Sequence, residues 1–124
     1  MRMRRKRVQE LYLKNRETVK DGQGSTYEEY AEPVLFRGEV WAAGGKVQAE
    51  MYGERLSYIR NVKIQGKYVI TTDRKGVVHY VYPDGVDVSE SDGVCLYVSK
   101  DSKPDYKIIS MKPYEPLRLE CEKI

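Results

Sequence analysis

The C-terminal stretch, residues 104–124, carries the pattern that most constrains the fold. It consists of two apolar-rich runs separated by a corner bounded by prolines. In the second run Leu117, Leu119 and Cys121 alternate with charged residues, the period of a β-strand with one buried and one solvated face. The sequence therefore predicts a terminal β-hairpin, and its strands require further strands as partners.

Short runs of the same kind recur along the rest of the chain. Strands are expected at residues 8–20, 26–30, 34–42, 57–65, 67–72, 76–82 and 93–99. Turn residues between them predict two further hairpins, one around residues 21–24 and one around residues 73–76. Residues 86–91 are polar and are expected to form a connection. In residues 46–55, Val47 and Met51 have helical spacing, which predicts one helical turn in a long connection.

These elements predict an all-β protein, a small antiparallel β-barrel or barrel-like sandwich with long loops and at most one short helical turn. A length of 124 residues suits one domain. We expect a basic N-terminal arm at residues 1–7, a single domain at residues 8–124, and within it an extended hairpin at residues 66–85.

The positive charge of the chain is concentrated at its start. The formal net charge is +3, and it becomes −2 without the five cations of the arm, which are Arg2, Arg4, Arg5, Lys6 and Arg7. The positive charge therefore does not come from the domain at residues 8–124, which weakens the case that this domain binds nucleic acid. The arm is a candidate for contact with DNA or phosphate, and the alternative is a solvated terminus.

Other features of the composition bear on the cellular compartment. The two cysteines, Cys95 and Cys121, lack the spacing of a disulfide-rich secreted protein and suit a reducing compartment. A disulfide between them is the alternative that the sequence leaves open. No apolar run approaches the length of a membrane helix, and no apolar signal core follows the basic start. We expect a soluble protein that does not contact a membrane. A mean hydropathy of −0.67 favours long polar loops or segments that order on assembly.

No catalytic or metal-binding pattern stands out. His79 is the only histidine, and the sequence places no activated nucleophile beside it, so we interpret it as a half-buried or exposed strand residue. Cys95, Cys121 and His79 lack the close spacing of zinc ligands. Residues 87–93 are similar to a calcium loop, but the Gly and the closing Glu are misplaced, which favours a solvated acidic loop. We expect neither enzymatic activity nor a cofactor.

Several motifs recur in an order that resembles the head-tail adaptor proteins of tailed bacteriophages, also called head-tail joining or head-closure proteins. The motifs are an Asp-x-x-Gly turn (Asp21 to Gly24), a Val-Trp-Ala strand (Val40 to Ala42), a Gly-containing segment with Glu50, an Arg-containing strand (Ile59 and Arg60), a Tyr-x-Ile strand (Tyr106 to Ile108) and a final strand (Leu117 to Ile124). The similarity extends from about residue 8 to the end. The hairpin at residues 66–85 is longer than the corresponding connection in that family.

The resemblance implies a structural subunit of a homo-oligomeric ring that joins the DNA-filled capsid to the tail. The implied partners are other copies of the chain, the portal or adaptor protein, tail completion or tail tube proteins, and the DNA passing through the channel. The implied location is the neck of the virion, after assembly in the host cytoplasm. As contacts within the ring we propose Met51, Tyr52 and Glu54, because exposed Met and Tyr favour interfaces.

Two alternatives remain open at the level of sequence. One is a tail-terminator type of connector. The other is a small nucleic-acid-binding barrel that uses Tyr58, Tyr80 and Tyr82 as stacking platforms and the basic arm as electrostatic support. An enzyme that uses His79 ranks below both.

Overall fold

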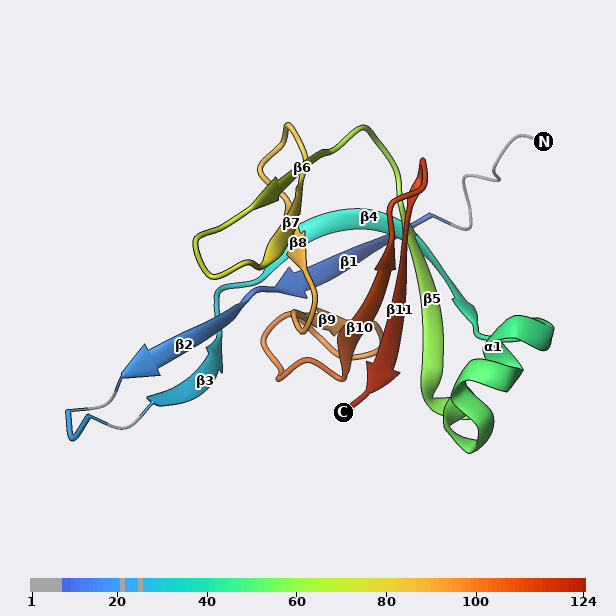
Figure 1. Ribbon diagram of the computed structural model, residues 1–124, viewed down its shortest axis with the longest axis horizontal. Coiled ribbons are helices and arrows are strands. Elements are labelled where there is room, and N and C mark those ends of the chain that lie inside the picture. The colour runs from blue at the N-terminus through green and yellow to red at the C-terminus, as the bar shows by residue number, and fades with distance from the viewer. Residues whose placement is uncertain (1–7, 21, 25) are drawn as a thin grey trace.

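The computed structural model of the chain describes residues 8–20, 22–24 and 26–124, with only the backbone described at residues 18–20 and 26–28. Across these residues the fold is a closed barrel of antiparallel strands that carries a two-stranded ribbon, a three-stranded sheet and one helical segment (Figure 1). The predicted fold class, an all-β protein built on a small antiparallel barrel, is confirmed.

Six strands form the wall of the barrel. In the order in which they lie side by side they are β1 (Gln9–Lys14), β4 (Val34–Ala42), β5 (Ile59–Ile64), β11 (Leu117–Lys123), β10 (Tyr106–Lys112) and β9 (Gly93–Cys95). The pairing of β9 with β1 closes the barrel. Because the sheet closes on itself, these six strands hide their own edges.

Alternating apolar residues from these strands fill the interior of the barrel. Leu117, Leu119 and Cys121 are each 0% exposed, as the pattern of the terminal run predicts. Each fully buried Leu side chain contributes about 1.5–3 kcal/mol to the stability of the fold. The terminal hairpin is formed by β10 and β11, and β11 also pairs with β5, so the last strand has the partners that its buried face requires.

Gly38 allows β4 to pass close to β5. It lies opposite Ile64 in the ladder, and a β-carbon at this position would lie 2.6 Å from the main-chain oxygen of Lys63 and 3.3 Å from the ring of Phe36. Real β-carbons do not approach a backbone oxygen so closely, so only glycine fits without a shift of the strand. The close approach lets the Phe36 side chain, 4% exposed, pack into the core.

The remaining strands lie outside the wall of the barrel. β2 (Arg16–Lys20) and β3 (Thr26–Tyr30) form a ribbon that continues beyond β1 and projects away from the barrel (Figure 1). β6 (Val69–Thr72), β7 (Val78–Val81) and β8 (Asp87–Ser89) form a separate sheet. Tyr80 and Val88 of this sheet belong to the buried cluster that fills the barrel, so the sheet extends the core. Both predicted hairpins outside the barrel are present.

Two predictions about residues 86–99 are wrong. Residues 86–91 are not a polar connection, since they contain β8, and Val86 and Val88 are 3% and 0% exposed. Only two apolar residues alternate there, and their polar neighbours hide the pattern in the sequence. The strand expected at residues 93–99 ends at Cys95, and Val98 beyond it is 38% exposed.

Candidate functional site

The helical segment between β4 and β5 is the first candidate for contact with a partner. It consists of α1 (Gly45–Tyr52) and the short 3-10 helix η2 (Gly53–Tyr58), and none of its residues is buried. Gly53 ends α1 with a φ of +54°, a conformation that glycine adopts readily. The helical turn expected within residues 46–55 lies in this segment, which extends to Tyr58.

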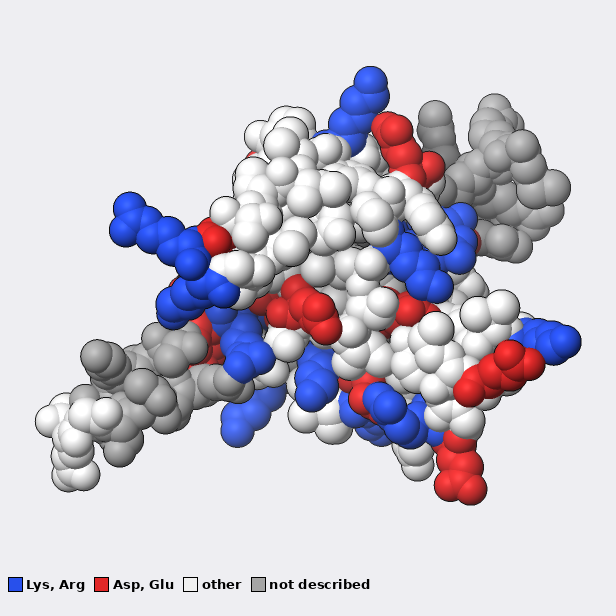
Figure 2. All heavy atoms as spheres, in the orientation of Figure 1, with Lys and Arg blue, Asp and Glu red and all other residues white. Residues whose placement is uncertain are grey.

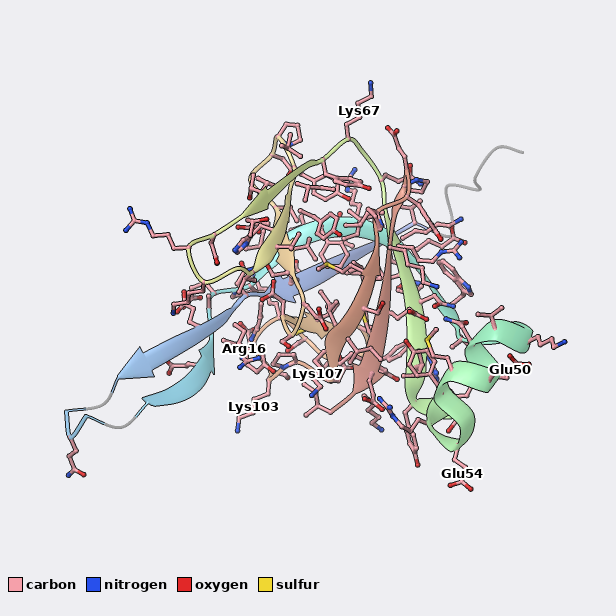
Figure 3. The ribbon with its side chains drawn as sticks, viewed as in Figure 1. Arg16, Glu50, Glu54, Lys67, Lys103 and Lys107 are labelled. Carbon is pink, nitrogen blue, oxygen red and sulfur yellow. The ribbon has the colours of Figure 1, made fainter. Side chains whose placement is uncertain are left out.

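Residues three or four apart on a helix share a face, so the segment has two faces. We call one the inner face (Gln48, Tyr52 and Arg55), because it contacts the barrel wall. We call the other the outer face (Val47, Glu50, Met51 and Glu54). Figure 3 shows Glu50 and Glu54 pointing away from the barrel.

The inner face is held by polar contacts. The Gln48 Nε2 group donates hydrogen bonds to Asn61 Oδ1, at 2.7 Å, and to Glu120 Oε2, at 2.8 Å. Glu120 is 1% exposed, and its other oxygen lies 4.0 Å from Lys112 Nζ. Burial, together with a hydrogen bond to the Glu120 carboxylate, raises the pKa of Tyr52 to about 12. Breaking these contacts leaves buried polar groups unpaired, so the helix is fixed in one orientation.

The outer face is partly apolar and faces solvent. Val47 and Met51 are 68% and 57% exposed. In a typical surface helix the apolar face covers the core and the polar face meets water. Here Tyr52 and Leu56 are half-buried, but Val47 and Met51 are left in solvent beside Glu50 and Glu54. Of the three predicted contact residues, Met51 and Glu54 lie on this exposed face, whereas Tyr52 is half-buried on the inner face. Their role in a ring stays a prediction.

A second candidate is a hollow beside the C-terminal strands, which we call the basic hollow. Its volume is about 280 Å³, and it is lined by Arg16, Tyr30, Ser91, Lys107, Glu122, Lys123 and Ile124. Figure 2 shows Lys and Arg side chains along this lower side of the molecule, and Figure 3 shows Arg16, Lys103 and Lys107 on the same side. Such a surface attracts acidic groups of a partner.

His79 has three polar partners in the sheet of β6, β7 and β8. Its Nε2 atom lies 2.9 Å from Asp73 Oδ2, and its Nδ1 atom lies 2.9 Å from Asp87 Oδ1 and 2.8 Å from Ser89 Oγ. The hydrogen bond to Asp73 and then the Asp87 carboxylate raise the pKa of His79, whereas burial opposes them. Two carboxylates need two N–H donors, so this geometry favours the doubly protonated ring.

The sequence did not reveal this cluster. The register of β7 and β8 places Ser89 opposite His79, and no pattern in residues 86–91 indicates that pairing. The combination of Ser, His and Asp has the composition of a hydrolase triad. However, Ser89 is 5% exposed and both ring nitrogens already face carboxylates, so the ring has no position from which to take a proton from Ser89. The expectation that the protein is not an enzyme stays a prediction.

The interpretation of residues 87–93 as a solvated acidic loop is wrong for Asp92, which is 3% exposed. Asp92 accepts hydrogen bonds from the backbone N–H groups of Arg16 and Ser89, and its Oδ2 atom also accepts one from Asn15 Nδ2. Burial raises the pKa of Asp92, and these three donors oppose that effect. The carboxylate therefore ties the start of the β2–β3 ribbon to the turn after β8.

The remaining predictions concern the basic arm, the stacking tyrosines and the two cysteines. The basic arm, Arg2, Arg4, Arg5, Lys6 and Arg7, lies outside the described residues. Tyr80 and Tyr82 are 8% and 6% exposed, so they cannot act as stacking platforms, whereas Tyr58 is 54% exposed. Both cysteines are free and buried.

Neither a metal-binding group of side chains nor a membrane-spanning helix is found in the part of the chain that the structure describes. No three His, Cys, Asp or Glu side chains there are grouped so that they could hold a metal ion. None of the helices described has the length and apolar character needed to cross a membrane.

Comparisons with known proteins gave no match: no family model, no curated protein and no solved structure is significantly similar to this chain.

Proposed function

We propose that this protein is a structural subunit of a tailed bacteriophage or prophage, a head-tail connector that forms a homo-oligomeric ring between the capsid portal and the tail. It acts through shape and contact. The observation that carries the proposal is the exposed outer face of the helical segment, because a fixed helix with exposed Val47 and Met51 is suited to contact with another subunit.

The positions of the resemblance motifs also support the proposal. The Val-Trp-Ala motif lies in β4, Ile59 and Arg60 lie in β5, the final motif covers β11, and the Tyr-x-Ile motif lies in β10. These four strands are consecutive neighbours in the barrel wall. Motifs that are far apart in the sequence therefore belong to one continuous surface, and Glu50 lies on the helix that joins two of the strands.

The projecting elements are compatible with a ring. The β2–β3 ribbon extends away from the barrel, and isolated two-stranded ribbons are marginally stable in water. A neighbouring subunit would supply packing for it. The closed barrel meanwhile provides a rigid body from which the ribbon and the helix extend.

Electron microscopy tests the proposal. The purified protein is imaged alone and after mixing with rings of the portal protein encoded in the same gene cluster. We expect rings of the protein, or a ring docked on the portal. If neither forms over a wide range of protein concentration, the proposal is wrong. Gene order gives a second test, since portal and capsid genes on one side and tail genes on the other are expected.

A further inference from the structure

We propose that the outer face of the helical segment (Val47, Glu50, Met51 and Glu54) docks into the basic hollow of a second copy of this chain. The inference rests on the proposed function, because it names the two surfaces through which neighbouring subunits join.

The outer face requires a cover that its own chain does not supply. Val47 and Met51 expose 68% and 57% of their surface, and the hydrogen bonds of Gln48 and Arg55 hold the helix with this face outward. Rotating the helix to bury them would leave Glu120, which is 1% exposed, without its hydrogen bond from Gln48. A partner can cover the apolar side chains without breaking any of these contacts.

The basic hollow has the complementary chemistry. Tyr30 and Ile124 on its wall are 37% and 64% exposed and offer apolar surface. Lys107 and Lys123 on the same wall are exposed cations. Glu122 on the same wall accepts two hydrogen bonds from Arg55 and lies opposite Lys107 in the strand ladder.

The match has two parts. The apolar side chains of the outer face meet the apolar wall, and Glu50 and Glu54 meet Lys107 and Lys123. Charge complementarity of this kind fixes the register of an interface and excludes wrong partners.

The two surfaces are separate, although Glu122 of the hollow binds Arg55 on the inner face of the helical segment. Figure 3 shows Glu50 and Glu54 on the helical segment at one side of the barrel, with Lys107 on the side toward the ribbon. Since the helix is fixed with its outer face away from its own barrel, the contact joins two copies. A contact between two unlike surfaces is heterologous, and repetition of it closes a ring when the rotation allows.

Charge reversal on each surface tests the inference. One variant carries Glu50→Lys and Glu54→Lys, and the other carries Lys107→Glu and Lys123→Glu. Assembly is measured by analytical ultracentrifugation and electron microscopy, with the protein alone and on portal rings. Each variant alone is expected to require a protein concentration about tenfold higher or more for half-assembly, because like charges then face each other. In an equal mixture, every alternating contact is again between opposite charges, and assembly is expected to recover.

Matched variants at other surfaces control for the change in net charge. Lys67→Glu with Lys75→Glu matches the basic pair, and Glu90→Lys with Glu115→Lys matches the acidic pair; all four residues are exposed. These variants are expected to assemble like the original protein. Circular dichroism checks that every variant is folded, and a Met51→Ser variant tests the apolar part of the contact without any change in charge.

The outcomes separate the two proposals. If the original protein assembles and both charge-reversed variants assemble equally well, this interface is wrong and the proposed function stands. If either charge-reversed variant fails alone but the mixture does not recover, the pairing of these two surfaces is wrong. If the original protein assembles neither alone nor on portal rings, both proposals are wrong.

Discussion

Arg55 of η2 donates two hydrogen bonds of 2.7 Å, from Nε and Nη2, to the two carboxylate oxygens of Glu122 on β11. The planar guanidinium matches both oxygens at once, a geometry that lysine cannot reproduce. The pair connects residues 67 positions apart in the sequence. It anchors the second half of the helical segment to the terminal strand, while Gln48 anchors the first half.

The variant Glu122→Gln tests this anchor. The hydrogen bonds from Arg55 hold the pKa of Glu122 below its ordinary value. The carboxylate therefore stabilises the fold above its unfolded pKa of about 4.3, and this contribution is lost as the pH falls through the lowered pKa. We expect a melting temperature a few degrees lower for the variant near neutral pH, and no difference in strong acid. A difference that persists in strong acid would show that the pair does not act through its charge.

A pH titration of His79 by NMR tests its two carboxylate contacts. Because its pKa is raised in the folded protein, the stabilisation is complete below the unfolded pKa of about 6.5 and is lost as the pH rises through the folded value. The hydrogen bond from His79 lowers the pKa of Asp73, so that part of the stabilisation is lost as the pH falls through the lowered value. We expect the folded protein to give a pKa above 6.5 for His79 and the variant Asp73→Asn to reduce it. A ring that titrates at or below the ordinary value contradicts the proposed contacts.

Removal of the Asp92 carboxylate is expected to destabilise the protein strongly. The variant Asp92→Ala removes the acceptor of the Arg16 and Ser89 N–H groups and one of the two hydrogen bonds that Asn15 Nδ2 donates, since Asn15 keeps its bond to the Asp87 carbonyl oxygen. Each buried unsatisfied donor costs about 1–3 kcal/mol, so we expect a total loss of about 2 kcal/mol or more in the free energy of unfolding measured with urea. The exposed Asp101 provides the control, since Asp101→Ala is expected to have little effect. Equal stability of the two variants would mean that water replaces the carboxylate.

The variant Gly38→Ala tests the close approach of β4 and β5. The added methyl group would lie 2.6 Å from the Lys63 carbonyl oxygen, so a strand must shift. We expect a loss of about 1–3 kcal/mol in the free energy of unfolding, the usual cost of overpacking. Gly22→Ala is the matched control, because nothing lies within 4 Å of a β-carbon at that position. A Gly38→Ala variant as stable as the control would show that the strands separate at little cost.

The barrel could be predicted from the sequence where the alternation was long. Leu117, Leu119 and Cys121 give three buried positions in a row, and the turn around residues 21–24 marks a hairpin directly. The β8 strand is not predictable, because Val88 is its single buried apolar residue and Val86 just before it adds only one more position to the pattern. Strand pairing was not predictable, since the register of distant strands depends on the core that they build together.

The candidate site was predictable only in part. Met51 and Glu54 were identified from residue type, and the helical spacing of Val47 and Met51 was recognised. The orientation of the helix depends on Glu120 and Glu122, which contact it from a strand about 70 residues later in the sequence. In the sequence Glu120 and Glu122 alternate with apolar residues, and this pattern predicts that both side chains face solvent. The basic hollow likewise brings together residues from β2, β10 and β11, and no local pattern connects them.

The seam between β1 and β9 is short: three residue pairs join them, Tyr12 to Cys95, Leu13 to Val94 and Lys14 to Gly93. During synthesis β4, the first partner of β1, follows β1 closely along the chain. The second partner, β9, is synthesised only about 80 residues after β1. The nascent chain must therefore keep one edge of an apolar sheet unpaired while the residues between Lys14 and Gly93 are synthesised. Closure of the barrel waits for β9, so chains that stop before it are expected to be the form most exposed to aggregation and to chaperones.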